Sequence, residues 1–393
     1  MTDFPPILIA GGGIGGLAAA LALAKLGRRS IVIERATGPV AAGAGIQLGS
    51  NAVKALRRLG VAEAVAAVAS VPDALVIRQG VDGSVLTRMP LGATIARRYG
   101  APYWVVHRAD LHRVLAEAAT AQSCITMMTG CSVATISSDG DRVALVCDDG
   151  TRIEGSAVVG ADGLWSRVRA AVAPQAVTEP SGFCAYRALI PVGQAGILSE
   201  SVVGAWLSPK AHVVHYPVRN GQAINVVVIV RNAWTSEAWG MPAHARDVHD
   251  ATAGFARSLG NVLGVASSWH QWSLAKPLVL PVWCHGLVTV LGDAAHPMLP
   301  FFAQGGAMAL EDAVCLGVSV ARHPSDLRRA FADYAASRQD RTARVQAAST
   351  RNGAIFHLAG PWALARNAAL QLLPPAAQLA RLDWLYGYEV TPS

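Results

Sequence analysis

Residues 7–26, ILIAGGGIGGLAAALALAKL, decide the fold predicted for this chain. A short apolar strand runs into the glycine turn GGGIGG (residues 11–16) and then into a helix of Ala and Leu. In a strand–turn–helix unit of this kind, Gly11 permits the tight turn, Gly13 lets the backbone approach a pyrophosphate, and Gly16 lets the helix lie close to the strand. The helix N-terminus offers free N–H groups to the phosphates. The predicted cofactor-binding glycines are Gly11, Gly13, Gly15 and Gly16.

A second predicted strand, residues 30–33, ends at Glu34. A carboxylate about twenty residues after the glycine turn is placed to bind the hydroxyls of a ribose. Together, the turn and the acid favour a dinucleotide site over the alternative, a buried βαβ unit without a ligand.

Composition limits the classes of function. The chain has 393 residues, 52% hydrophobic and 15% charged, which predicts one large or two modest ordered domains. The net charge of +7 comes from scattered Arg residues, which favours small anionic ligands over nucleic acid. No stretch of about twenty apolar residues is free of charges and breakers, so no membrane span is expected. The first predicted strand begins almost at Met1, so no signal peptide is expected either. The six Cys residues form no metal-binding or disulfide pattern, so we expect reduced thiols, no metal and a cytoplasmic protein.

A second glycine-containing segment follows the apolar run 286–291. Asp293 comes directly after Gly292, and a helix is predicted to begin near Gly305 and Gly306. A second helix N-terminus facing the same site suits a long ligand with a pyrophosphate at one end and an electron-rich ring at the other. FAD is such a ligand, with its ribityl or ribose hydroxyls on Asp293.

The order of the segments predicts an α/β protein with a Rossmann-type FAD-binding domain, an inserted sheet-based substrate domain and C-terminal helices. We assign residues 1–72, 102–174 and 275–345 to the FAD-binding domain. The substrate domain takes residues 73–101 and 175–274, and the C-terminal helical segment takes residues 346–393. That last segment is expected to cover the core, with a dimer face as the alternative.

Local signals predict several element ends. Residues 36–50 are expected to form a loop, and Ser50 or Asn51 to cap the helix that follows. Asp110 is expected to cap a helix beginning at Leu111, which leaves Arg108 on the preceding loop.

Three motifs in order resemble those of the single-component flavoprotein monooxygenases that hydroxylate aromatic acids. These are GGGIGG at 11–16, GADG at 160–163 and GDAAHP at 292–297. The segments MPLGATIARRYG, HRADLH and AHPMLPFFAQGGAMALEDA and the terminal WLYGYEV look most like the 6-hydroxynicotinate 3-monooxygenase branch. Salicylate and 3-hydroxybenzoate hydroxylases come next.

The resemblance implies the cofactors and the roles of many side chains. It implies an FAD cofactor, NADH or NADPH as co-substrate, and O₂ used through a flavin hydroperoxide. Tyr216 and His212 would be catalytic. The cofactor residues, besides the four glycines, would be Glu34, Arg35, Gln47, Arg108, Val133, Asp162, Asp293, Gly305, Gly306 and Ala307. The substrate pocket would comprise Gln47, Pro297, Met298, Phe301 and Tyr216.

The expected substrate is a small hydroxy- or amino-substituted aromatic or N-heteroaromatic carboxylic acid, hydroxylated by a monomer or homodimer. Gln47 stands where the hydroxynicotinate enzyme has a His, and because Gln cannot take a proton near neutral pH the base is expected to differ. His296 is expected to fix a loop, and Arg187 could pair with the substrate carboxylate. The alternatives are another flavin oxidoreductase, such as a halogenase or a reductase, and a non-catalytic flavin-binding protein.

Overall fold

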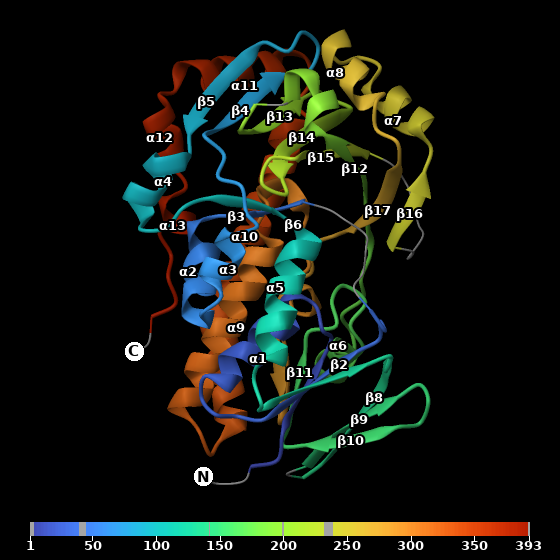
Figure 1. The fold of residues 1–393 in the computed structure, drawn as a ribbon, viewed down its shortest axis with the longest axis vertical. Coiled ribbons are helices and arrows are strands. Elements are labelled where there is room, and N and C mark those ends of the chain that lie inside the picture. Colours follow the sequence, from blue (N-terminus) through green and yellow to red (C-terminus); the bar gives the residue numbers. More distant parts are fainter. Residues whose placement is uncertain (1–3, 39–44, 141, 199, 232–238, 392–393) are drawn as a thin grey trace.

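The computed structural model describes residues 4–38, 45–140, 142–198, 200–231 and 239–391. Figure 1 shows two parts stacked along the long axis, each built around its own sheet. The chain passes back and forth between the two parts, so segments far apart in sequence meet at their junction. None of the described helices is both long and apolar enough to cross a membrane.

The lower part contains a six-stranded sheet in the order β18-β19-β11-β1-β2-β7, in which all neighbours are parallel except β18 and β19. Its strands are β1 (Ile7–Ala10), β2 (Ser30–Glu34), β7 (Ile125–Thr129), β11 (Ala157–Gly160), β18 (Cys284–His285) and β19 (Val288–Val290). Every residue of β1, β11 and β19 is buried, as expected for parallel strands covered on both faces. The parallel α/β class predicted from the sequence is confirmed.

Helices pack around this sheet and reach toward the junction of the two parts (Figure 1). They are α1 (Ile14–Ala24), α2 (Ser50–Leu59), α3 (Ala62–Ala66), α5 (Arg108–Thr120), α6 (Arg167–Val172) and α9 (Gly305–Arg322). Gly27 and Gly60 adopt positive φ just after α1 and α2, as is common for glycines that end helices.

Tertiary contacts override the predicted caps. Helix α5 begins at Arg108, with His107 at the N-cap, so Arg108 is not on a loop and Asp110 lies in the first turn. Ser50 and Asn51 lie inside α2, whose N-cap is Gly49. The Ser50 hydroxyl instead donates to the Ala101 carbonyl at 2.6 Å, a partner that local sequence cannot reveal.

Part of the segment predicted as a loop is a strand. β3 (Gly45–Leu48) pairs antiparallel with β6 (Trp104–His107) at the junction of the two parts. Residues 39–44 of the predicted loop lie outside the described residues.

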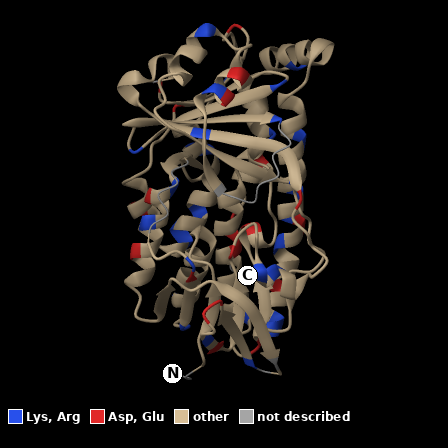
Figure 2. Cartoon of the chain, turned by 90° about the vertical axis from the view of Figure 1, so that its right-hand side faces the viewer, with Lys and Arg blue, Asp and Glu red and all other residues tan. Residues whose placement is uncertain are grey.

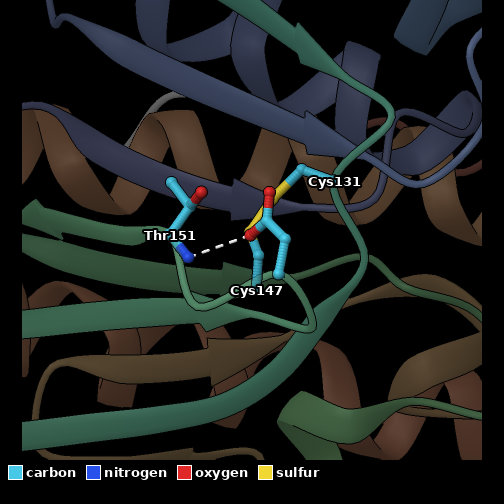
Figure 3. The surroundings of a disulfide bond; sticks show 4 residues. Cys131, Cys147 and Thr151 are labelled. Atoms are coloured by element: carbon cyan, nitrogen blue, oxygen red, sulfur yellow. Dashed lines mark hydrogen bonds between the residues drawn. A yellow bond between two sulfur atoms is a disulfide. The ribbon is translucent and has the colours of Figure 1, made fainter.

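A small antiparallel sheet of β8 (Val133–Asp139), β9 (Arg142–Cys147) and β10 (Arg152–Gly155) lies at the lower edge (Figure 1). It brings together two thiols that were expected to be free. Cys131 and Cys147 form a disulfide with their Cα atoms 5.9 Å apart (Figure 3). The β8–β9 register places Val133 opposite Cys147 and so carries Cys131 to its partner. Sequence spacing alone cannot show this pairing; the other four cysteines take no part in a disulfide.

The upper part is an eight-stranded sheet in the order β16-β17-β12-β15-β14-β13-β4-β5. Its strands are β4 (Ala74–Gln79), β5 (Val85–Pro90), β12 (Pro180–Pro191), β13 (Val202–Leu207), β14 (Ala211–Val218), β15 (Ala223–Arg231), β16 (Trp239–Ala243) and β17 (Trp269–Ala275). Two helices follow β16, α7 (Ala245–Thr252) and α8 (Arg257–Leu263). The remaining short elements are α4 (Gly92–Tyr99), η1 (Val192–Gln194), η2 (Gly196–Leu198), η3 (Gly292–Ala294) and η4 (Pro300–Phe302).

The C-terminal segment is helical throughout much of its length. It comprises α10 (Leu327–Phe356), α11 (Gly360–Leu372), α12 (Pro375–Ala380) and α13 (Asp383–Tyr386). One side of helix α10 is buried and includes Phe331 and Tyr334, whereas most of α11 is exposed. The two sheets follow the segment order that we predicted, and the exact domain bounds stay a prediction.

Candidate active site

The carboxyl ends of four parallel strands meet at one edge of the six-stranded sheet. Gly11 follows β1, Glu34 ends β2, Asp162 comes two residues after β11 and Asp293 comes three residues after β19. Ligands of open α/β sheets bind outside this edge. The tertiary structure therefore gathers four predicted cofactor positions that are up to 282 residues apart in the sequence.

Backbone atoms lie too close for a side chain at two positions of the glycine turn, and a third position is open. A Cβ at Gly11, where φ is +103°, or at Gly16 would overlap backbone oxygen atoms, those of Ala161 and Gly11 respectively. A Cβ at Gly13 would meet nothing within 4 Å. Gly11 and Gly16 therefore serve the fold itself, whereas Gly13 leaves free space in front of the N-terminus of α1.

Because Gly13 faces open space and Gly16 is tightly packed, we expect substitutions at these two positions to have different effects. Gly13→Ala should leave the unfolding midpoint of the apoprotein unchanged but weaken FAD affinity by about tenfold or more, because a methyl group occupies the space of the pyrophosphate. Gly16→Ala should lower the midpoint itself, because overpacking costs about 1–3 kcal/mol. Urea unfolding of apoprotein and titration with FAD measure the two effects. Equal FAD affinity in Gly13→Ala and the wild type would contradict a pyrophosphate at this turn.

Glu34 is fixed by the backbone. Its carboxylate accepts hydrogen bonds from the Gly12 and Ala36 amides, both at 2.8 Å. His112 of α5 lies 2.8 Å from the Gly12 carbonyl and holds the other side of the turn. Arg35 is exposed next to Glu34. Val133, another predicted cofactor residue, is two residues from Cys131, whose amide donates to the Glu34 carbonyl at 3.1 Å.

Arg108 points its positive charge toward both acids of the edge. Burial lowers the pKa of Arg108, and the charges of Asp293 and Glu34 oppose that shift, so the guanidinium lies within electrostatic reach of both. A half-buried cation within electrostatic reach of two carboxylates is suited to binding a phosphate group. This position fits the predicted contact with the pyrophosphate side of FAD.

Asp162 caps a helix. One carboxylate oxygen accepts from the Ser166 hydroxyl, and the other accepts from the Arg167 and Val168 amides at 2.7 and 3.1 Å. Burial raises the pKa of Asp162, although these three hydrogen bonds oppose the shift. Its side chain therefore fixes the start of α6, and its cofactor role stays a prediction.

Asp293 is recessed. Its side chain is accessible to solvent, but protein surrounds the carboxyl group, and this burial raises its pKa. The charges of His296 and Arg108 oppose that shift. A Cβ on Gly305 would lie 3.9 Å from both Asp293 Oδ1 and Met298 Cγ. The carboxylate is thus placed beside the first turn of α9, where the amides of Gly305, Gly306 and Ala307 have no partner within the helix.

Helices α1 and α9 run side by side in the same direction. A Cβ on Gly15 would lie 3.5 Å from Ala309, near the start of α9, and a Cβ on Gly317 would lie 3.1 Å from Ala22, near the end of α1. The two N-termini therefore face the same region, as predicted, and both favour negative charge there.

A buried ionic network lies beneath this region. Asp312 accepts hydrogen bonds from the Gly292 amide at 3.0 Å and Arg338 Nε at 2.7 Å, and it also bonds His296. Glu311 pairs with Arg338 at 2.8 Å and with Arg341 at 2.6 Å. Burial alone would raise the pKa of Asp312, but His296 and Arg338 lower it to about 2. His296 thus fixes the loop, as expected, and the network holds the turn that carries Asp293.

Sequence reasoning missed most of this network. Asn51 donates to Gln304 and Glu311 at 3.0 and 2.7 Å, which ties α2 to the start of α9. Arg338 is completely buried, although it belongs to an Arg-rich helix, α10. The Glu311-Asp312 pair in a largely apolar helix was the available signal, because two buried acids require buried cations.

Tyr216 lies at the junction with the upper sheet. It is opposite Asn225 on β15, and a Cβ on Gly45 would overlap its ring. Gln47 of β3 accepts from the Tyr103 hydroxyl at 2.6 Å and lies close enough to Tyr216 to act on the pKa of its hydroxyl. The structure thus brings together two predicted site residues, Tyr216 and Gln47. Burial raises the pKa of Tyr216, with Arg187 and Gln47 opposing, so its hydroxyl is protonated near neutral pH.

Two buried donors near Tyr216 lack a protein partner among the described residues. They are Arg187 Nε and Asn225 Nδ2. The strand registers place Arg187, Asn225 and Tyr216 on the same face of the sheet, toward the lower part. The Arg187 guanidinium lies 4.9 Å from the Trp272 ring, and its charge acts on Tyr216 and on Arg108. Unpaired buried donors are costly, so a site with two of them is suited to a polar ligand.

His212 is separated from this cluster. It lies four residues before Tyr216 on β14, about 13 Å along the strand. Its Nδ1 is 3.1 Å from Nε2 of His357 on α10, and its ring lies 5.4 Å from the Phe301 ring. Burial and His357 lower the pKa of His212 to about 3. These contacts favour a packing role, and its assignment as the base stays a prediction.

The residues predicted to form the pocket wall also fall into two groups, one near His212 and one near Asp293. Phe301 packs with His212 and Phe183, at 5.4 and 5.3 Å between ring centroids. The Pro297 carbonyl accepts from Gln346 of α10 at 2.9 Å, and Met298 lies beside Gly305. The loop therefore spans from Asp293 to the His212 end of the upper sheet.

Because two histidines are buried, we expect the free energy of unfolding to decrease in acid. The pKa of His212 and of His215, which burial chiefly lowers, is about 3 in the folded protein against 6.5 for a free His. Between these pH values the unfolded chain binds more protons, so stability rises with pH and falls as pH drops below 6.5. The slope is up to about 1.4 kcal/mol per pH unit for each His.

Urea unfolding at several pH values from 7 to 4 measures this slope. His212→Gln should make it shallower by about one proton, whereas His249→Gln, at an exposed position, should not change it. The same slope in His212→Gln and wild type would show that His212 is not buried in its neutral form.

The strand-edge carboxylates, the glycine turn and the two helix N-termini define a dinucleotide-binding protein, and comparison with known proteins identifies its family. A model of the FAD binding domain family matches residues 5–349, and the chain belongs to this family. It is 38% identical to 3-hydroxybenzoate 6-hydroxylase 1 of Aquipseudomonas alcaligenes, over 98% of both chains. It is 33% identical to 6-hydroxynicotinate 3-monooxygenase of Pseudomonas fluorescens, over 90% of this chain and 92% of that one.

Solved structures agree with this assignment. A salicylate hydroxylase substrate complex superposes with a TM-score of 0.82 at 25% identity, over 99% of this chain and 96% of that chain. The predicted family is confirmed. The higher identity to the hydroxybenzoate enzyme reverses the order suggested by the motifs, which placed the hydroxynicotinate branch first.

Proposed function

We propose that this protein is an FAD-dependent monooxygenase that uses NAD(P)H and O₂ to hydroxylate a small hydroxy- or amino-substituted aromatic carboxylic acid. The family, the fold and the relatives all support this class. The observation that carries the substrate class is the pair of unpartnered buried donors, Arg187 Nε and Asn225 Nδ2, beside the Tyr216 hydroxyl. The cytoplasmic location also remains a proposal.

The residues at the strand edge fit FAD. Free space in front of Gly13, the Arg108 cation and the fixed Glu34 carboxylate suit a pyrophosphate joined to a ribose. Asp293 and the amides of Gly305 to Ala307 would hold the ribityl and flavin end. When bound there, FAD supplies the redox chemistry that moves electrons from NAD(P)H and an oxygen atom from O₂ to the substrate ring.

The protein's own part is to bind and orient the ring. Arg187 would pair with the substrate carboxylate, and Tyr216 and Asn225 would hydrogen bond the ring substituent. Burial raises the pKa of Tyr216, so its hydroxyl is neutral and can donate to the substrate oxygen. The apolar residues Leu299 and Phe301 cover the adjoining sheet face and exclude water from it.

The substrate preference is tested with a panel of hydroxylated and aminated benzoates, nicotinates and picolinates. We expect stimulated NADH or NADPH oxidation, a product with one added oxygen atom, and a preference for hydroxybenzoates over hydroxynicotinates. An FAD-loaded protein whose NAD(P)H oxidation no acid stimulates would favour the non-catalytic alternative. A chlorinated product or a reduced double bond would instead favour the halogenase or reductase.

Tyr216→Phe removes only one hydroxyl group. We expect kcat for the best acid to fall about 10²-fold or more, with FAD content unchanged, because general acid–base groups contribute about 10²–10⁴. Rapid mixing of reduced enzyme with O₂ and measurement of product per NAD(P)H consumed separate slow from uncoupled turnover. Tyr99→Phe, at a hydroxyl bonded to Asp383 at 2.7 Å, is the matched control. Full, coupled turnover in Tyr216→Phe would remove Tyr216 from the mechanism.

A further inference from the structure

The two amide side chains beside Tyr216 both have their oxygen atom occupied. Asn225 Oδ1 accepts a hydrogen bond from the Gly45 amide at 2.7 Å, and Gln47 Oε1 accepts one from the Tyr103 hydroxyl at 2.6 Å. A primary amide has one oxygen that accepts and one NH₂ group that only donates. The NH₂ groups are therefore the ends left for a further partner, and Asn225 Nδ2 has none among the described residues.

Backbone geometry fixes these orientations. A backbone N–H can only donate, so the Asn225 oxygen must face Gly45. Gly45 and Gln47 lie two residues apart on β3 and so share one face, and a Cβ on Gly45 would lie 2.8 Å from the Tyr216 hydroxyl oxygen. Gln47 lowers the pKa of Tyr216, the direction expected when an N–H group lies near a phenol oxygen. The NH₂ end of Gln47 is thus the end toward Tyr216.

Tyr103 holds the oxygen end of Gln47. It directly precedes β6, whose pairing with β3 places Gln47 opposite Val105. The Tyr103 side chain is buried, and its ring packs edge-on against Tyr386 of α13 with 5.9 Å between centroids. The hydroxyl is therefore kept at the Gln47 oxygen, and a ligand meets the NH₂ group instead.

The upper sheet supplies positive charge and no carboxylate. Its eight strands contain four arginines and no Asp or Glu (Figure 2). Arg187 lies on the same face as Tyr216, and all five of its N–H groups donate. Burial, Tyr216 and Arg108 act on the pKa of Arg187, and none of these is an acid. This face therefore offers donors to a ligand and lacks a carboxylate that could receive an N–H group.

We propose that Gln47 and Asn225 form a polarity filter, a pair of donors that binds an oxygen substituent of the aromatic ring and rejects an amino group. Tyr103 is the positioning residue of the filter, because its hydroxyl keeps the Gln47 oxygen away from the ligand. The filter rests on the proposed function and narrows its substrate class from hydroxy- or amino-substituted acids to hydroxy-substituted acids.

The discrimination follows from hydrogen-bonding capacity. A hydroxyl or phenolate oxygen has lone pairs that accept from both NH₂ groups. An amino group on an aromatic ring presents N–H donors, and its nitrogen lone pair is delocalised into the ring. Gln47 is half-buried, so a ligand can reach it, and an amino group there would leave donors facing donors. A site built for a hydrogen bond rejects an analogue that cannot make it, here by about 10²-fold or more.

Binding of matched acids tests the filter. The flavin absorbance of FAD-loaded protein is titrated with the three hydroxybenzoate isomers, the three aminobenzoate isomers and unsubstituted benzoate. The wild type should bind the best hydroxybenzoate about 10²-fold or more tightly than the aminobenzoate of the same substitution pattern. Benzoate measures the rest of the site. Equal Kd values for the hydroxy and amino members of every pair would overturn the proposal.

Two variants change the filter without removing the site. In Gln47→Glu one carboxylate oxygen can still accept from Tyr103 while the other faces the ligand, so the preference for hydroxy over amino should fall by about tenfold or more. In Tyr103→Phe the Gln47 oxygen is free to turn toward the ligand, so the preference should also fall, with FAD content and benzoate affinity unchanged. Because Tyr103→Phe alters no atom of Gln47, it decides the question even where Gln47→Glu lowers FAD content.

Tyr99→Phe is the matched control for Tyr103→Phe. Tyr99 packs edge-on against the same Tyr386 ring, at 5.8 Å, but its hydroxyl bonds Asp383 at 2.7 Å and not Gln47. Tyr99→Phe should keep the wild-type preference. A wild-type preference in Tyr103→Phe, or an equal loss of benzoate and hydroxybenzoate affinity, would show that Tyr103 serves packing alone.

Turnover separates the filter from the proposed function. Hydroxylation of hydroxybenzoates and aminobenzoates with equal kcat/KM and equal Kd would overturn the filter and leave the monooxygenase standing. Tighter binding of hydroxybenzoates without any NAD(P)H oxidation would support the filter and overturn the monooxygenase. Failure of every benzoate to bind would overturn the filter, whereas the nicotinates and picolinates of the wider panel would still test the monooxygenase.

Discussion

Replacing Arg338 with alanine is expected to lower the free energy of unfolding by about 3–5 kcal/mol, because removing one partner of a buried ion pair leaves uncompensated charge. Arg338 is completely buried and is the cation shared by Glu311 and Asp312. Glu311 keeps Arg341, but Asp312 keeps only His296 and the Gly292 amide. We therefore also expect a displaced Gly292-Asp293 turn and weaker FAD retention.

Urea unfolding of apoprotein and holoprotein, together with FAD release on dilution, measures both effects. Arg351→Ala, at an exposed position on the same helix, should change stability by less than about 0.5 kcal/mol. Asp312→Asn in the Arg338→Ala background should recover part of the loss, because the unpaired charge is removed. Arg338→Ala with wild-type stability would show that the two acids are not held as carboxylates by this cation.

The second large effect concerns substrate recognition. Arg187→Met is expected to lower kcat/KM for the preferred aromatic acid by about 30-fold to several thousand-fold. Truncating a buried charge partner costs about 2–5 kcal/mol, and each 1.4 kcal/mol is tenfold. The rise in KM should exceed the fall in kcat, since a carboxylate remote from the reacting carbon is bound equally before and during the reaction.

The neutral amide of the same substrate provides the internal control. Arg187→Met should lose its discrimination between acid and amide, whereas Arg231→Met, at an exposed position on neighbouring β15, should retain it. Equal losses for acid and amide would contradict carboxylate binding. Loss of FAD instead would place Arg187 with Arg108 at the cofactor phosphates, since the charges of these two side chains act on each other.

Sequence periodicity and glycine placement were sufficient for the cofactor half of the molecule. Continuous apolar runs at residues 7–10 and 157–160 predict buried parallel strands, and both form. Residues at the carboxyl ends of parallel strands must share one edge, so Glu34, Asp162 and Asp293 could be assigned to that edge without coordinates. Local rules succeed here because this chemistry depends on backbone geometry that the sequence encodes within short segments.

Local rules failed where a side chain finds a distant partner. The predicted cap Asn51 instead bonds Gln304 and Glu311, more than 250 residues away. Cys131 and Cys147 meet only because the β8–β9 register aligns them. His212 and Tyr216 share a strand face, as the two-residue period requires, but one contacts His357 and the other Gln47.

The sequence by itself determined the class of fold, the sheet edge at which the predicted cofactor residues meet, and the family, because glycine turns, strand periodicity and motif order are properties of short segments. Only the tertiary structure decided which charges are buried together, which cysteines pair, and which donors are left without a partner beside Tyr216. Those features depend on contacts across hundreds of residues, and the energy of a buried charge or donor is set by the partner that folding brings to it.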